Sequence, residues 1–268
     1  MPVLVAGGVL AAGRPLVVAG LKGFCDERLA GLADRGCFAS VGLTRVGEWI
    51  RHFRKHNVTR VVMIGSVRKG DMHGKRRLLA YRPDLRTAKL WYGKLRHDKR
   101  DNAALLVCSD ELAREGITLM DSTEYCSEHL AHEGVMTQTQ PTASQQADGV
   151  FGFEIARQSA RLDIGQSLAV RERDIIAVEA VEGTDAMIRR AGELCPRGQW
   201  TMIKVARPDQ DMRFDVPTIG PHTIKHLQEA GCSLLVIEAE KTLIVDKPTT
   251  LELADRAKLA IMGIASPE

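Results

Sequence analysis

The stretch SLAVRERDIIAVEAVEGTDAMIRRAGELCPRGQWTMIKVA, residues 167–206, decides the fold class. Two runs rich in aliphatic and β-branched residues, SLAVRE and IIAVEAVE, follow each other so closely that they predict neighbouring strands. TDAMIRRAGEL then has the pattern of an amphipathic helix, and WTMIKVA returns to a strand. Such alternation indicates an α/β protein, in which helices cover a sheet.

The same alternation continues to the end of the chain. PHTIKHLQEAG predicts a helix that stops at Gly231, and PTTLELADRAKL predicts a last helix. LLVIEA, TLIVD and AIMGI predict the remaining strands. Residues 150–268, which open with the helical pattern FGFEIARQSARLD, are therefore predicted to form a C-terminal mixed α/β domain.

The first half of the chain also alternates between strands and helices. PLVVAGL and RVVMIG predict buried strands, and RVGEWIRHFRKH between them predicts a helix with its apolar face at Val46, Trp49, Ile50 and Phe53. DNAALLVCSDELAREG predicts a further helix. We expect an N-terminal Rossmann-like sheet-and-helix domain over residues 1–133, and the Thr-, Gln- and Ser-rich residues 134–149 predict a linker.

Composition narrows the class of protein. The chain has 268 residues, of which 44% are hydrophobic, enough to fill cores without help from a membrane. No run of about 18 apolar residues occurs, and the start lacks a basic flank, so we expect a cytoplasmic protein. The six cysteines form no CxxC pair, which argues against a zinc ribbon or a disulfide framework.

Basic residues are unevenly distributed, although the net charge is only +3. They are concentrated between Arg45 and Arg100, where they could neutralise phosphates, meet an anionic membrane surface, contact nucleic acid, or form an ordinary solvated face. Within this stretch, RVVMIG is followed by Gly65, Ser66, Arg68 and Lys69. Because open α/β sheets bind ligands where strands end, these residues predict a phosphate-facing loop.

Residues 179–220 have an unusual density of charge. The acids are Glu179, Glu182, Asp185, Asp209, Asp211 and Asp215, and the bases include Lys204, Arg207 and Arg213. Carboxylates at this density repel one another unless a cation lies between them, and oxygen ligands suit Mg²⁺. The bases would offset the charge of a pyrophosphate. The segment therefore predicts a site for phosphate chemistry with Mg²⁺.

Each of these residues also has a plainer structural interpretation. Thr184 or Asp185 could cap the helix that starts there, and Glu179 could be an ion-pair partner within a strand. Arg213 and Asp215 could pair on one face of an extended segment.

The histidine pairs His222/His226 and His52/His56 have a spacing that can bind zinc. Neither an HExxH motif nor paired cysteines accompany them, which argues against a zinc site.

EGTDAMIRR and KVARPDQDMRFDVPTIG, together with RLDIGQSLAV, RPLVVAGLKG, VVMIGSVRK and RPDLR, resemble the LpxI family of UDP-2,3-diacylglucosamine pyrophosphatases of lipid A biosynthesis. The resemblance implies a two-domain enzyme with its active site in the cleft between the domains. It also implies that Mg²⁺ directs water onto the α-phosphorus of the lipid nucleotide. The products would be UMP and 2,3-diacylglucosamine 1-phosphate, lipid X.

The resemblance and the charge pattern together assign roles to individual residues. The family's essential aspartate in the motif D-x-P-T-I-G falls on Asp215, and its E-G-T-D motif covers residues 182–185. The expected catalytic residues are Asp215, Asp185 and Lys204. The expected substrate-binding residues are Gln166, Gly183, Thr184, Arg213, Thr218 and Gly65. The expected metal ligands are Asp215, Asp211 and Glu182.

The chain departs from the family pattern at two places. Family members open with a strand and a glycine-rich loop, whereas PVLVAGGVLAAG here aligns with the helix that follows them, so the first strand is expected to be missing. Asn102 stands where relatives often have an aspartate. Transient contact with the inner membrane and a homodimer are further expectations.

Two other classes of protein remain open on the sequence. A non-catalytic protein that binds a nucleotide sugar or a lipid phosphate would use the same charged residues without the hydrolytic step. A nucleic-acid-binding module is the other alternative, but 3 Tyr, 3 Trp and 6 Phe supply few rings for base stacking.

Overall fold

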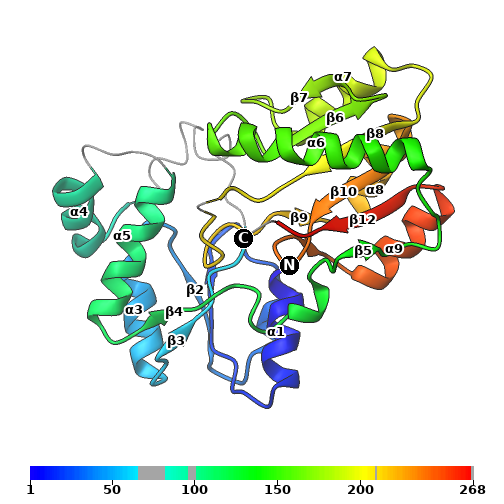
Figure 1. The fold of residues 1–268 in the computed structure, drawn as a ribbon. Coiled ribbons are helices and arrows are strands. Elements are labelled where there is room, and N and C mark those ends of the chain that lie inside the picture. The colour runs from blue at the N-terminus through cyan, green and yellow to red at the C-terminus, as the bar shows by residue number, and fades with distance from the viewer. Residues whose placement is uncertain (66–81, 96–100, 209, 267–268) are drawn as a thin grey trace. The chain divides into compact units, whose positions relative to one another are not determined.

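The computed structural model describes residues 1–65, 82–95, 101–208 and 210–266, with only the backbone described at 94–95 and 101–103. Two compact units make up the chain, Met1–Cys126 and Ser127–Glu268 (Figure 1). Both combine helices with strands, so the predicted α/β class is confirmed. No helix in the described ranges combines the length and the apolar character needed to cross a bilayer.

Within its described residues, the N-terminal unit contains two small parallel sheets flanked by helices. Its strands are β1 (Val18–Leu21), β2 (Phe38–Val41), β3 (Arg60–Val61) and β4 (Thr118–Leu119), with β1 paired to β2 and β3 to β4. Its helices are α1 (Pro2–Ala11), α2 (Arg28–Leu32), α3 (Val46–Lys55), α4 (Leu85–Leu90) and α5 (Asp101–Arg114), with a π-helical turn over Trp91–Leu95. As expected from PVLVAGGVLAAG, a helix precedes the first described strand.

Helix α3 has the apolar face that its spacing predicts. Val46, Ile50 and Phe53 are buried against Leu112 and Ile117. The strand predicted from RVVMIG is shorter than expected. It pairs only through Arg60 and Val61, with Thr118 and Leu119 of β4.

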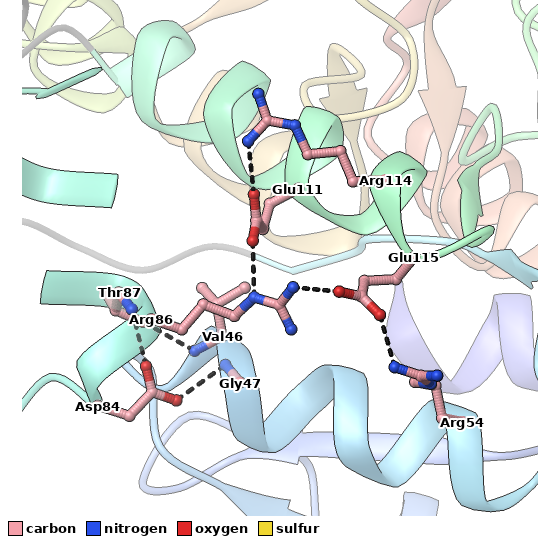
Figure 2. Close-up of polar contacts among 9 residues, drawn as sticks. All are labelled: Val46, Gly47, Arg54, Asp84, Arg86, Thr87, Glu111, Arg114 and Glu115. Atoms are coloured by element: carbon pink, nitrogen blue, oxygen red, sulfur yellow. Dashed lines mark hydrogen bonds and ion pairs between the residues drawn. The ribbon is translucent and has the colours of Figure 1, made fainter. Parts of the chain in front are cut away.

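Backbone amides at the start of α3 are capped by side chains that precede and begin α4 (Figure 2). Asp84 caps α4 by accepting a hydrogen bond from the amide of Thr87 at 2.8 Å, and its other oxygen accepts from the amide of Gly47 at 2.8 Å. The hydroxyl of Thr87 accepts from the amide of Val46 at 3.0 Å. Because helix-terminal amides lack partners within their own helix, this exchange joins the two helices.

An ionic network holds α4 against α5 (Figure 2). Arg86 donates to Glu111 at 2.6 Å and also to Glu115, which accepts from Arg54 at 2.7 Å. Glu111 also accepts from Arg114 at 3.0 Å. Burial opposes the ionisation of Glu111, but Arg86 and Arg114 outweigh it and hold the pKa of this carboxyl below its usual value.

The C-terminal unit is built on a six-stranded sheet with the order β5-β12-β10-β8-β6-β7. These strands are β5 (Gly134–Val135), β6 (Ser167–Arg171), β7 (Asp174–Val178), β8 (Trp200–Lys204), β10 (Cys232–Glu238) and β12 (Ala260–Ile264). A separate parallel pair consists of β9 (Thr218–Ile219) and β11 (Leu243–Ile244). The helices are α6 (Ala143–Arg161), α7 (Thr184–Leu194), α8 (Pro221–Glu229) and α9 (Lys247–Arg256).

Helices cover both faces of this sheet. Helix α6 packs on one face, where Phe153, Ala156 and Ala160 meet residues of β8 and β10 (Figure 1). It lies so close that a Cβ at Gly152 would come within 2.6 Å of Ile203. Helices α7, α8 and α9 pack against the opposite face and form a second hydrophobic core with it. Met187 of α7 and Leu227 of α8 are fully buried there. Helices α7 and α8 therefore lie on the same face of the sheet.

The boundary between the units differs from the expected one. The N-terminal unit ends at Cys126, and residues 134–149, predicted as a linker, belong to the C-terminal unit. They contain β5, which pairs antiparallel with β12, and the first residues of α6. Thr142 and Gln145 form a capping box at the start of α6, a T-x-x-Q signal that the polar composition of the segment obscured.

Candidate active site

Strand direction brings the two acidic loops to one edge of the C-terminal sheet. Strand β6 runs antiparallel to both β7 and β8, so β7 and β8 point the same way and end at the same edge. The loop that starts at Glu179 follows β7, and the loop that carries Asp215 follows β8. Gln166 lies at this edge too, since Ser167 pairs with Lys204.

Lys204 is the last residue of β8, and the charges of three carboxylates act on its ammonium group. Its Nζ donates to the carbonyl oxygen of Thr218 at 3.3 Å. Burial lowers the pKa of Lys204 below the usual value for lysine. The charges of Glu179, Asp215 and Asp185 act in the opposite direction. The predicted catalytic residues Lys204, Asp185 and Asp215 are therefore electrostatically coupled in the structure.

Glu179 belongs to this group. The sequence placed it among the acids of the predicted phosphate site, with an ion-pair partner in a strand as the plainer interpretation. The hydroxyl of Thr184 donates to its Oε1 at 2.7 Å. The other oxygen, Oε2, is buried without a hydrogen-bond partner. A buried carboxylate oxygen in that condition is unfavourable unless a cation or a ligand meets it. Glu179 is a candidate functional residue that periodicity alone could not identify.

Gly165 explains why the segment RLDIGQS can approach Glu179. A Cβ at Gly165 would lie 2.0 Å from the carbonyl oxygen of Glu179, a distance that no side chain tolerates. The amide of Glu179 donates to the carbonyl oxygen of Ser167 at 2.8 Å. The glycine therefore lets the segment before β6 pack against the first acidic loop.

The capping role expected for Thr184 or Asp185 is wrong. Gly183 occupies the N-cap position of α7, has a φ of 83°, and makes no side-chain cap. That left-handed φ favours glycine. The hydroxyl of Thr184 is bonded to Glu179, and Asp185 lies exposed in the first turn of α7.

The predicted metal ligands Glu182 and Asp211 each contact an arginine. Glu182 lies 3.0 Å from Arg190 and accepts a hydrogen bond from the amide of Ala180. Asp211 pairs with Arg213 at 2.7 Å, and this hydrogen bonding lowers the pKa of the Asp211 carboxyl. The third predicted ligand, Asp215, is exposed.

Gln210 braces the second acidic loop, and its role was not anticipated from the sequence. Its Oε1 accepts from Gln166 Nε2 at 2.9 Å and from the amide of Arg207 at 3.0 Å. Its amide nitrogen donates to the carbonyl oxygen of Asp215. One side chain thus connects predicted substrate-binding Gln166 to the backbone of predicted catalytic Asp215.

The remaining predicted site residues are less tightly grouped. Arg213 lies over the ring of Phe214, 5.1 Å from its centroid, and the hydroxyl of Thr218 donates to the carbonyl oxygen of Val216. Gly65, in the N-terminal unit, is exposed with a φ of 121°. Ser66, Arg68 and Lys69 of the expected phosphate-facing loop, and Asp209, lie outside the described residues, as do the side chains of Asp101 and Asn102.

Histidines of α8 complete a cluster with Asp185. Within the described part of the chain, the only three histidine, cysteine or carboxylate side chains whose ligand atoms all come within 4.8 Å are Asp185, His222 and His226. The predicted ligands Asp215, Asp211 and Glu182 are not gathered in this way. The third donor of the histidine pair comes from α7, which spacing along α8 could not indicate.

Family models match almost the whole chain. The LpxI N-terminal domain model matches residues 1–129, and the LpxI C-terminal domain model matches residues 132–262. The chain belongs to the LpxI family. It is 33% identical over 276 residues to "UDP-2,3-diacylglucosamine pyrophosphatase LpxI" of Caulobacter vibrioides, an alignment that covers 100% of this chain and 95% of that protein.

The LpxI domain models also bear on the boundary and the site. The junction of the two models, between residues 129 and 132, lies before the predicted linker 134–149. Glu179, Lys204, Gln210 and Asp215 all lie within the LpxI C-terminal domain. The coupled carboxylates and the ammonium group of Lys204 are therefore contained in one domain of the family.

Proposed function

We propose that the protein hydrolyses the pyrophosphate bond of UDP-2,3-diacylglucosamine in lipid A biosynthesis. Water attacks the α-phosphorus, and the products are UMP and 2,3-diacylglucosamine 1-phosphate, lipid X. Full-length similarity to the Caulobacter protein supports this substrate. The observation that carries the chemistry is the electrostatic interaction of the Lys204 ammonium group with the carboxylates of Glu179, Asp215 and Asp185.

The donor atoms around Lys204 suit a hard divalent cation. They are carboxylate oxygens, which Mg²⁺ prefers, and one of them, Glu179 Oε2, is buried without a hydrogen-bond partner. We propose Asp215 as the principal Mg²⁺ ligand. We propose Glu182 and Asp211 as further ligands. To bind the ion, their carboxylates would have to release their present partners, Arg190 and Arg213. Bound Mg²⁺ would offset the negative charge of the pyrophosphate.

The side chains of the site divide the remaining work. Lys204, held by the carbonyl of Thr218, contributes a positive charge toward the phosphate oxygens, and Arg213 contributes a second one. The exposed carboxylate of Asp215 accepts a proton from the attacking water and orients it. The charges of Glu179, Asp215 and Asp185 favour the protonated form of Lys204 against the effect of its burial.

Binding of the substrate involves the neighbouring polar groups. Gly183 exposes its backbone at the start of α7, where the helix dipole favours an anion. Thr184, Thr218 and Gln166 line the same edge and supply hydrogen bonds, and Gly65 of the N-terminal unit is a further predicted contact.

A cytoplasmic protein that takes a two-tailed lipid needs transient access to the inner membrane. Leu85, Trp91 and Tyr92 are exposed, with 93%, 50% and 75% of their surface accessible, and Lys89 lies among them. Aromatic and basic side chains of this kind favour a lipid interface. We therefore propose that the protein contacts the inner membrane transiently, and we also propose that it forms a homodimer.

The proposed function is tested by incubating the purified chain with UDP-2,3-diacylglucosamine and measuring UMP by chromatography. We expect release of UMP with Mg²⁺, loss of release after chelation, and loss in Asp215→Ala with an unchanged circular dichroism spectrum. Full activity of Asp215→Ala would remove the role given to that residue. Binding of the lipid without release of UMP under any divalent ion would instead indicate a non-catalytic binding protein.

A further inference from the structure

Two helices on one face of the C-terminal sheet present three metal-ligating side chains to one another. His222 and His226 are separated by one turn of α8, and Asp185 lies in the first turn of α7. One ligand atom from each of the three residues lies within 4.8 Å of the other two. Helices α7 and α8 are in contact, so this arrangement is set by the packed core beneath them.

The hydrogen bonding of His226 leaves one atom unsatisfied. Its Nδ1 is buried and has no hydrogen-bond partner, although it lies 3.4 Å from Oδ1 of Asp185. The rings of His222 and His226 have their centroids 4.0 Å apart. A cation that accepts the lone pairs of both rings would satisfy these groups together with the carboxylate.

We propose that Asp185, His222 and His226 bind one divalent transition-metal ion of the Zn²⁺ or Co²⁺ class. Two imidazole nitrogens and one carboxylate oxygen suit such an ion, whereas Mg²⁺ prefers an all-oxygen set. Three protein ligands leave a coordination position open for water or an anion. The metal site is inferred from geometry. It shares Asp185 with the proposed hydrolytic site, but its test does not depend on hydrolysis.

The other histidine pair provides an internal comparison. His52 and His56 are also one helical turn apart, on α3, with ring centroids 4.9 Å apart. His52 Nε2 lies 3.2 Å from the carbonyl oxygen of Cys37, and no third ligand atom completes a group with this pair among the described residues. Cys37 Sγ lies 3.8 Å from His56 Nδ1. Among the described residues, however, a third ligand atom within 4.8 Å of a ligand atom on both histidines is found only for the pair on α8.

The protein is first treated with a chelator and then titrated with Co²⁺ in the presence of excess Mg²⁺, with binding monitored by visible absorption. A second titration, with Zn²⁺, is monitored by calorimetry. We expect one equivalent of ion to bind with ligand-field bands of a nitrogen-containing site. His222→Gln and His226→Gln should each weaken binding by more than about tenfold. The double variant His52→Gln/His56→Gln should bind as the wild type does.

Thermal melts of the variants establish that they are folded, and exposed His222 offers a second variant if His226→Gln is unstable. Failure of the wild-type protein to bind Co²⁺ or Zn²⁺ in excess Mg²⁺ would overturn the proposal. Unchanged affinity in folded His222→Gln, or an equal loss in the His52/His56 variant, would also overturn it. Because these experiments measure metal binding and not UMP release, a negative result would not bear on the proposed hydrolysis.

Discussion

The hydroxyl of Thr184 donates a hydrogen bond to Oε1 of Glu179 at 2.7 Å, which joins the first residue of α7 to the residue that follows β7. This bond leaves the other carboxylate oxygen of Glu179 buried and without a hydrogen-bond partner. The same carboxylate interacts with the ammonium group of Lys204. Thr184 therefore helps to orient the charge of Glu179 within the site.

Because the two side chains act as a unit, we expect Thr184→Val and Glu179→Gln to be non-additive in kcat/KM. The double variant should be less impaired than the product of the single effects by about fivefold, which corresponds to a coupling of about 1 kcal/mol. The coupling is measured from the rates of UMP release by the wild type, the two single variants and the double variant. Strict additivity would show that the hydrogen bond has no part in the reaction.

Replacement of Lys204 by methionine tests the positive charge itself. Lys204→Met keeps an unbranched side chain but removes the ammonium group, so kcat/KM should fall by at least about a hundredfold. Lys225→Met is the matched control, because Lys225 is an exposed lysine of the same domain that pairs with Glu229 on α8. Equal activity of both variants would exclude a role for Lys204 in stabilising the reacting phosphate.

Gly165 tests the close approach between two segments of the site. In Gly165→Ala the new Cβ would meet the carbonyl oxygen of Glu179 at 2.0 Å, so the loop must move. We expect a loss of about 1–3 kcal/mol in the free energy of unfolding and reduced turnover. Gly31→Ala serves as control, because nothing lies within 4 Å of its Cβ position in α2. Denaturant titrations of both variants measure the difference, and a wild-type stability for Gly165→Ala would contradict the close packing of this loop against Glu179.

Glu111 gives the N-terminal unit a pH-dependent contribution to stability. Its folded pKa lies below the unfolded value of about 4.3, so the contribution is present above that pH and is lost as the pH falls through the folded pKa. Glu111→Gln should destabilise the unit by about 1–2 kcal/mol at neutral pH. The gap between variant and wild type should narrow below about pH 4. Chemical unfolding across this range tests the prediction, and a gap independent of pH would contradict it.

The regular elements were predictable because their patterns are local. Helix α3 shows its buried face at Val46, Ile50 and Phe53 in the sequence, and α7 and α8 have boundaries close to those expected. The domain boundary was less predictable. Residues 134–149 look like a polar linker, yet β5 is fixed by pairing with β12, a partner at the far end of the chain.

The site was predictable only to the level of its loops. Motifs located Asp185, Lys204 and Asp215, which the structure couples electrostatically. Gln210 was missed, and Glu179 was named among the acids of the segment but given no role of its own. Their roles depend on contacts across the sheet edge rather than on spacing. The cluster of Asp185 with His222 and His226 has the same origin, since its ligands come from two helices.

The destination of the oxygen from water tests the central claim most directly. Hydrolysis of UDP-2,3-diacylglucosamine by the wild-type protein in ¹⁸O-labelled water, followed by mass spectrometry of both products, identifies the phosphorus that is attacked. Attack on the α-phosphorus predicts the label in UMP and none in 2,3-diacylglucosamine 1-phosphate. Label in the lipid phosphate, or no cleavage with Mg²⁺ present, would contradict the account.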